Sequence, residues 1–64
     1  MANLLKALIQ KLLGDIAVAK ANIEVYQDHP AGIGEHPDLV QAIDSQVEII
    51  AEAEDKIQVI NKYF

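Results

Sequence analysis

Residues 28–38, DHPAGIGEHPD, separate two regular apolar patterns and so decide the fold. The triplet acidic-His-Pro occurs twice in this stretch, on either side of a segment that contains two glycines. A residue that precedes proline is pushed out of the α region, whereas proline itself is favoured in the first turn of a helix. The first triplet is therefore placed to end a helix and the second to begin one. We predict a loop over about residues 29–36.

The apolar residues before the loop follow one another at alternating spacings of four and three: Leu5, Ile9, Leu12, Ile16, Ala19, Ile23 and Tyr26. This spacing predicts one long helix over about residues 3–28, with a single apolar seam and with Asn3 as its N-cap. Gly14 lies inside this helix, where glycine costs ~1 kcal/mol relative to alanine. We expect either a kink at Gly14 or the close approach of a neighbouring backbone.

The apolar residues after the loop form a strict seven-residue repeat with flanking positions on both sides: Ile43, Ile50, Ile57 and Phe64, then Leu39, Ala53 and Ile60, then Val40 and Val47. A second helix over about residues 37–63 is predicted, with Pro37 and Asp38 in its first turn. Glu52 and Lys56 are spaced to form an ion pair on its polar face. The stripe is wider than a contact between two helices requires.

A chain of 64 residues without cysteine buries little apolar surface alone and has no disulfide to stabilise it. We therefore predict an all-α fold, a single antiparallel helical hairpin over residues 1–64, that pairs as a homodimeric four-helix bundle. A trimer or tetramer is the lesser alternative. The side chains expected at the interface between copies are Leu5, Leu8, Leu12, Ile16, Ile23, Ile43, Val47, Ile50, Ile57 and Phe64.

Small and aromatic residues add two expectations about packing. Close approach of helices near the middle of the bundle is expected at the alanines: Ala17, Ala19, Ala21, Ala51 and Ala53. Tyr63 and Phe64 are expected to close the base of the bundle against Leu5 and Leu8, with the anchoring of a partner as the alternative.

The charge of the chain argues against nucleic acid as a partner. The net charge is −5, with five lysines and no arginine, whereas phosphate binding needs clustered basic side chains. Residues 1–27 carry three lysines against two acidic residues, and residues 28–64 carry two lysines against eight. The acidic half is interpreted as a solvated helix face, with a surface for a basic partner as the alternative.

No motif in the sequence indicates catalysis or a cofactor. There is no cysteine, no arginine, a single serine and no glycine-rich phosphate loop, so we expect a non-enzymatic protein. Glu54 lies beside the second apolar stripe, but the Glu-x-x-His motif of carboxylate metal sites in bundles is missing. The expected partner is a second copy of the chain.

The loop carries the remaining candidates for binding. Ile33 lies between two glycines with no core to join, so Ile33, Glu35 and His36 are predicted to contact a partner protein. The alternative is a metal-stabilised or metal-sensing oligomer in which His29 and His36 supply ligands. Their spacing matches no familiar zinc or calcium pattern, so turn formation is the preferred interpretation.

The first fourteen residues, MANLLKALIQKLLG, combine apolar side chains with Lys6 and Lys11, in the manner of a helix at a membrane surface. This is a further alternative for the function. The stretch is shorter than the ~20 apolar residues of a spanning helix and lacks the cleavage site of a signal peptide. We therefore expect a cytoplasmic protein.

The run from Asp15 to about Ile57, DIAVAKANIEVYQDHPAGIGEHPDLVQAIDSQVEIIAEAEDKI, resembles small two-helix proteins encoded by marine tailed phages, cyanophages in particular. The likeness lies in the segment ANIEVY, the Pro/Gly loop and the string GIGEHPD before an acidic helix. That family has no established activity, so no functional residue is carried over. The resemblance implies a viral protein made inside an infected bacterium, with a host or phage protein as a further partner.

Overall fold

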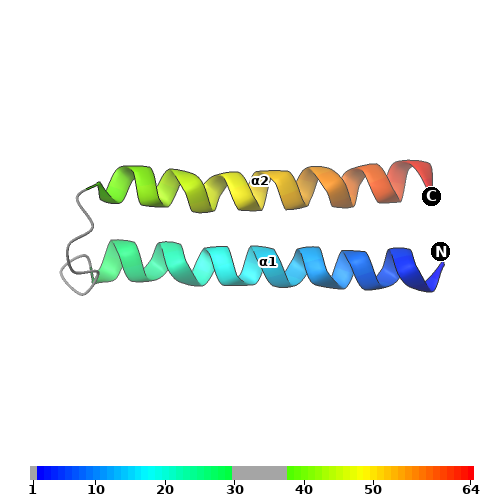
Figure 1. Ribbon diagram of the computed structural model, residues 1–64, viewed down its shortest axis with the longest axis horizontal. Helices are drawn as coiled ribbons and strands as arrows, with labels where there is room; N and C mark the ends of the chain where they lie inside the picture. The colour runs from blue at the N-terminus through cyan, green and yellow to red at the C-terminus, as the bar shows by residue number, and fades with distance from the viewer. Residues whose placement is uncertain (1, 30–37) are drawn as a thin grey trace.

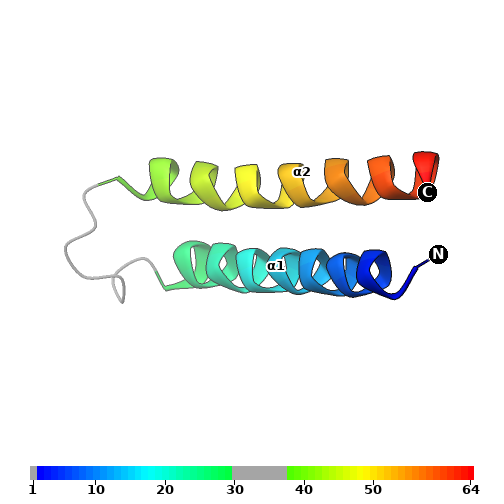
Figure 2. The same cartoon turned by 45° about the vertical axis from the view of Figure 1, so that its right-hand side comes forward.

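The computed structural model describes residues 2–29 and 38–64, which form two helices. Helix α1 spans Asn3–Asp28 and helix α2 spans Leu39–Tyr63. The helices lie side by side and antiparallel, with the two chain termini at one end of the molecule (Figures 1 and 2). The prediction of an all-α helical hairpin is confirmed, and the described residues contain no strand.

The first turn of α1 differs from the prediction by one residue. Ala2, with φ −66° and ψ 152°, is the N-cap, and Asn3 is already helical. The prediction that Asn3 caps the helix is therefore wrong. Alanine has no side-chain acceptor, so the cap makes no side-chain hydrogen bond to the amides of the first turn.

The start of α2 has a side-chain cap, and it too differs from the prediction. Asp38 was expected inside the first turn, but it lies before the helix with φ −137° and ψ 92°. Its Oδ1 accepts a hydrogen bond of 2.9 Å from the backbone N–H of Gln41. A carboxylate at this position satisfies a free amide and also complements the positive end of the helix dipole.

The core between the two helices is thin. The buried apolar residues of the described chain are Leu12, Ala19, Ala42, Ala53 and Ile60. Leu5, Ile9, Ile16 and Ile57 pack, half-buried, against the cluster of Leu12, Ala53 and Ile60. Ala19 and Ala53 are buried in the hairpin, whereas Ala17, Ala21 and Ala51 are exposed, and the close approach of helices in a bundle stays a prediction. Because alanine buries little surface, much of each apolar stripe stays uncovered.

Gly14 does not interrupt α1, which continues through it to Asp28. A Cβ atom placed on Gly14 would meet nothing within 4 Å. The expected close approach of a neighbouring backbone is therefore not present within the hairpin. The helical pattern on both sides of Gly14 is strong enough to carry the helix through the residue despite its low helix propensity.

The hairpin is elongated for its mass. Its Cα atoms extend over 44 × 15 × 15 Å, and its radius of gyration is 14.6 Å, where about 11 Å is expected for a compact chain of this length. The accessible surface is 4815 Å², against about 4,000 Å² for a compact monomer of this mass. The single hairpin therefore exposes more surface than a compact fold of this mass.

Candidate interaction surface

One long side of the hairpin is hollowed into a groove of about 410 Å³. The residues that line it come from both helices: Lys11, Leu12, Asp15, Val18 and Ala19 from α1, and Gln46, Ile49, Glu52, Ala53 and Lys56 from α2. Ala19 and Ala53 are 1% and 3% exposed and form part of its floor. Their side chains end at Cβ, so the floor lies low between the longer side chains around it. We call this side of the molecule the groove face.

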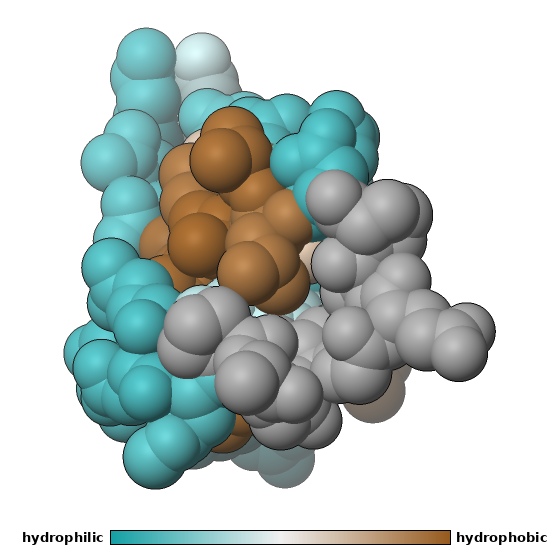
Figure 3. Space-filling model, turned by 90° about the vertical axis from the view of Figure 1, so that its left-hand side faces the viewer, coloured by the Kyte–Doolittle hydropathy of each residue, from teal (hydrophilic) through white to brown (hydrophobic). Residues whose placement is uncertain are grey.

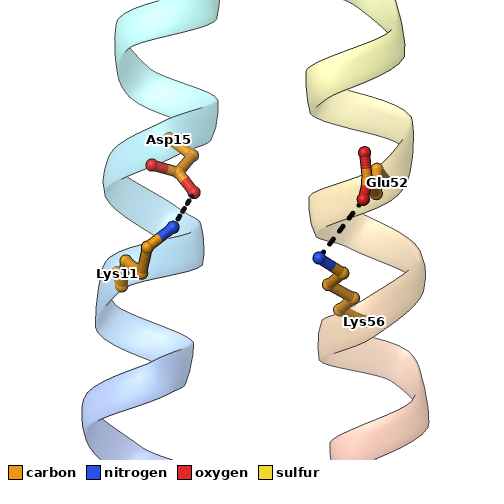
Figure 4. A network of polar contacts seen from close by, with 4 residues as sticks. All are labelled: Lys11, Asp15, Glu52 and Lys56. Atoms are coloured by element: carbon orange, nitrogen blue, oxygen red, sulfur yellow. Dashed lines mark hydrogen bonds and ion pairs between the residues drawn. The ribbon is translucent and has the colours of Figure 1, made fainter.

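Two ion pairs flank the groove (Figure 4). On α1, Lys11 Nζ lies 2.8 Å from an oxygen of Asp15, and on α2, Lys56 Nζ lies 3.2 Å from an oxygen of Glu52. The second of these pairs was predicted from its spacing and is confirmed. Each pair joins residues one helical turn apart, and all four side chains are at least 40% exposed. Such exposed pairs contribute little to stability.

The four charges are ordered along the groove by sign. Figure 4 shows the two lysines at about the same level on the two helices, and the two carboxylates together at the neighbouring level. The reason is the antiparallel direction of the helices. Lys11 precedes Asp15 in the chain but Lys56 follows Glu52, so like charges lie at the same level. One half of the groove is therefore basic and the other acidic.

Apolar side chains continue the groove face beyond the charges. Val18 is 62% and Ile49 40% exposed, and both line the groove on the side of the carboxylates. The positions three residues before Lys11 and three residues after Lys56 share that helix face. They hold Leu8 and Val59, which are 40% and 44% exposed. An exposed apolar band of this kind, bounded by polar residues, is typical of an interaction site.

Eight residues of the groove face form four levels along the hairpin, where a level is one residue of α1 and the residue of α2 at the same height. The pairs stay in step because both helices rise by the same distance per residue and run in opposite directions. In order from the end with the termini, the four levels are Leu8 with Val59, Lys11 with Lys56, Asp15 with Glu52, and Val18 with Ile49. One turn nearer the termini, beyond the first of these levels, lie Leu4 and Tyr63, which are 85% and 65% exposed.

The opposite side of the hairpin also exposes apolar residues, but fewer. Leu13 on α1 and Val47 on α2 are each about half exposed. At about 100° per residue, Lys20 lies on the same face as Leu13, and Glu54 lies on the same face as Val47. We call this side the opposite face.

The loop end carries a further group of exposed apolar residues. Figure 3, which views the molecule from that end, shows hydrophobic atoms gathered between hydrophilic ones. Val25 in the last turns of α1 and Val40 in the first turn of α2 are 49% and 79% exposed. His29, at the C-cap of α1, is exposed. The predicted partner-binding residues Ile33, Glu35 and His36 lie outside the described residues.

The side chains predicted at the interface between copies divide by their exposure in the single hairpin. Leu12 is buried, so it belongs to the core of the hairpin itself. The half-buried members are Leu5, Ile16, Ile23, Ile43, Ile50 and Ile57. The exposed members are Leu8, Val47 and Phe64. Val18 was missed because it lies outside the regular repeat of its helix.

The two aromatic residues at the C-terminal end are exposed in the single hairpin, and their predicted closure of the base of a bundle against Leu5 and Leu8 stays a prediction. Tyr63 and Phe64 are 65% and 72% exposed. Lys62 lies over the Tyr63 ring, with its Nζ 5.1 Å from the ring centroid. The two aromatic residues therefore add to the uncovered apolar surface at this end.

The other candidate sites find no support among the described residues. No group of three or more His, Cys, Asp and Glu side chains that could hold a metal ion occurs in residues 2–29 and 38–64. Glu54 is exposed in the single hairpin. In the same part of the chain, neither helix has an apolar window sufficient to cross a membrane.

The chain matches no protein-family model, no curated protein and no solved structure. The resemblance of residues 15–57 to small phage proteins therefore stays a prediction.

Proposed function

We propose that this chain is a self-associating helical module, in which two hairpins pair as a four-helix bundle that serves as a protein-binding or scaffolding element. The observation that carries the proposal is the exposure of apolar side chains along a hairpin with a thin core. Val18, Ile49 and Val59 are each between 40% and 62% exposed on regular, well-formed helices. Burying such side chains is the main driving force for association of helices in water.

The size of the uncovered surface supports pairing. The accessible surface of 4815 Å² exceeds that of a compact monomer of this mass by about 800 Å². A standard protein interface buries about this much on each partner. Pairing two hairpins would therefore bring the assembly to the compactness that is usual for globular proteins.

The proposal includes no catalytic step and no cofactor. A host or phage protein as a second partner is part of the proposal through the resemblance of residues 15–57 to phage proteins. The loop residues Ile33, Glu35 and His36 stay the predicted contact for such a partner, because binding residues often lie on loops positioned by a rigid scaffold.

Sedimentation equilibrium over a concentration series tests the proposal. We expect the mass of a dimer at high concentration, with dissociation on dilution accompanied by loss of helicity. A monomeric mass at every concentration, with helicity retained, would refute self-association.

The variant Val18→Asp with Ile49→Asp gives a second measurement. It places charges on the exposed apolar positions and should shift the species toward monomer. The matched control, Ala17→Asp with Ala51→Asp, places the same charges at exposed alanines and should leave the mass unchanged.

A further inference from the structure

The groove face is complementary to itself. Its four levels are apolar, basic, acidic and apolar in that order, and the apolar levels, Leu8 with Val59 and Val18 with Ile49, are matched in size. A rotation of the molecule by 180° that swaps its two ends therefore places the acidic level where the basic level was, and the reverse. The two apolar levels also change places with one another.

A two-fold axis makes use of this order. The axis lies in the plane of contact between the two groove faces and runs perpendicular to the helix axes. It passes between the level of Lys11 and the level of Asp15. A second copy rotated by 180° about this axis brings its two carboxylates opposite the two lysines of the first copy. Its Leu8 and Val59 then lie opposite Val18 and Ile49.

The parallel alternative lacks this match. If two copies met through the groove face with their loops at the same end, Lys11 and Lys56 would face lysines and Asp15 and Glu52 would face carboxylates. Like charges placed against one another across an interface are strongly unfavourable. The charges thus select the antiparallel arrangement.

We infer that a second copy of this chain occupies the groove face in the antiparallel orientation, with its lysines opposite the carboxylates of the first. This inference rests on the proposed self-association and specifies the face and the direction of pairing. The apolar levels supply the buried surface, and the exposed charges supply orientation and register rather than affinity.

The area of the face is sufficient. The hairpin is 44 Å long and 15 Å wide between Cα atoms, so one side offers on the order of 700 Å² before the relief of side chains is counted, close to the share of each partner in a standard interface. The opposite face has fewer exposed apolar positions and is not hollowed by the groove, so it offers less complementary surface.

Paired charge variants test the inference. The acidic variant, Lys11→Glu with Lys56→Glu, has four carboxylates around the groove, and the basic variant, Asp15→Lys with Glu52→Lys, has four lysines. Each alone is expected to dimerise more than tenfold more weakly than the wild type, because like charges would face one another. An equimolar mixture of the two is expected to restore the dimer, as measured by sedimentation equilibrium with circular dichroism to follow helicity.

A matched control separates position from net charge. Lys6→Glu with Lys20→Glu changes the net charge by the same amount as the acidic variant, but away from the groove face, and should leave the dimer intact. Dimerisation of both groove variants alone at wild-type strength would overturn the inference. So would a mixture that stays monomeric, or a control that dissociates while the acidic variant does not.

The same series distinguishes the two proposals. If the wild type is monomeric at every concentration, self-association fails and the assignment of the face fails with it. If the wild type is dimeric and the mixture shows no rescue, only the face and direction are wrong.

Discussion

The side-chain amide of Asn22 donates a hydrogen bond of 3.0 Å to Oε1 of Gln46, across the contact between α1 and α2. Both residues are half-buried. Contacts between apolar side chains allow one helix to shift along the other at little cost in free energy. A shift by one turn would break this hydrogen bond and leave two partly buried polar groups without a partner. The bond therefore helps to set the register of the hairpin, and with it the levels of the groove face.

The first prediction concerns this hydrogen bond. Asn22→Ala and Gln46→Ala should each lower the free energy of unfolding by ~0.5–1.5 kcal/mol. The double variant should lose less than the sum, with a coupling of about 0.5–1 kcal/mol. Urea unfolding followed by circular dichroism at equal protein concentrations measures both. The exposed pair Gln10→Ala with Gln58→Ala is the control, and its effects should add. Strict additivity at Asn22 and Gln46 would mean that the bond does not contribute.

Two adjacent leucines provide the second prediction. Leu12 is 3% and Leu13 47% exposed, so Leu12→Ala should cost ~2–5 kcal/mol through lost burial and the cavity that remains. Leu13→Ala should cost less than about 1 kcal/mol, because the groove-face dimer leaves this side chain uncovered. Thermal and urea unfolding compare the two variants. An equal loss at Leu13 would indicate that the opposite face is covered in solution.

Gly14 gives the third prediction. Since a Cβ on Gly14 meets nothing within 4 Å, Gly14→Ala should raise the free energy of unfolding by ~1 kcal/mol through better helix propensity. The midpoint of urea unfolding measures this gain. A loss of stability or of dimer mass would instead show that another copy approaches the backbone at Gly14.

The helical hairpin was predictable because its determinants are local in sequence. The spacing of apolar residues from Leu5 to Tyr26 and the two His-Pro steps specify two helices and a turn without reference to distant contacts. The Glu52–Lys56 pair was predictable for the same reason, since residues one turn apart on a helix are always neighbours.

The groove face was not predictable, because it depends on the register between helices. Whether Lys11 lies beside Lys56 or beside Glu52 is determined by loop length and by contacts such as that of Asn22 with Gln46. A shift of α2 by one turn would place opposite charges at the same level and remove the self-complementary order. Helix caps also escaped prediction by one residue: α1 is capped by Ala2, which lacks the side-chain acceptor that favoured Asn3, and Asp38 lies before α2 instead of inside its first turn.

The direction of pairing gives the last prediction. In the antiparallel dimer the loop ends point away from one another. Gln27 lies about fourteen residues from the level of the two-fold axis, so spin labels at Gln27→Cys in the two copies should be ~40 Å apart along the bundle, at 1.5 Å per residue. A parallel dimer would hold both labels at the same end, within about 10–25 Å, given interaxial distances of 8–10 Å and the reach of the labels. Pulsed electron spin resonance measures the separation.

Labels at Gln10→Cys provide the reference for that measurement, because Gln10 lies only about three residues from the axis and should give a short distance in either arrangement. A long distance at Gln27 together with a short one at Gln10 requires the antiparallel orientation. Short distances at both positions would place the two loop ends side by side and would contradict the antiparallel orientation. Lys11 and Lys56 would then not face Asp15 and Glu52 of the second copy.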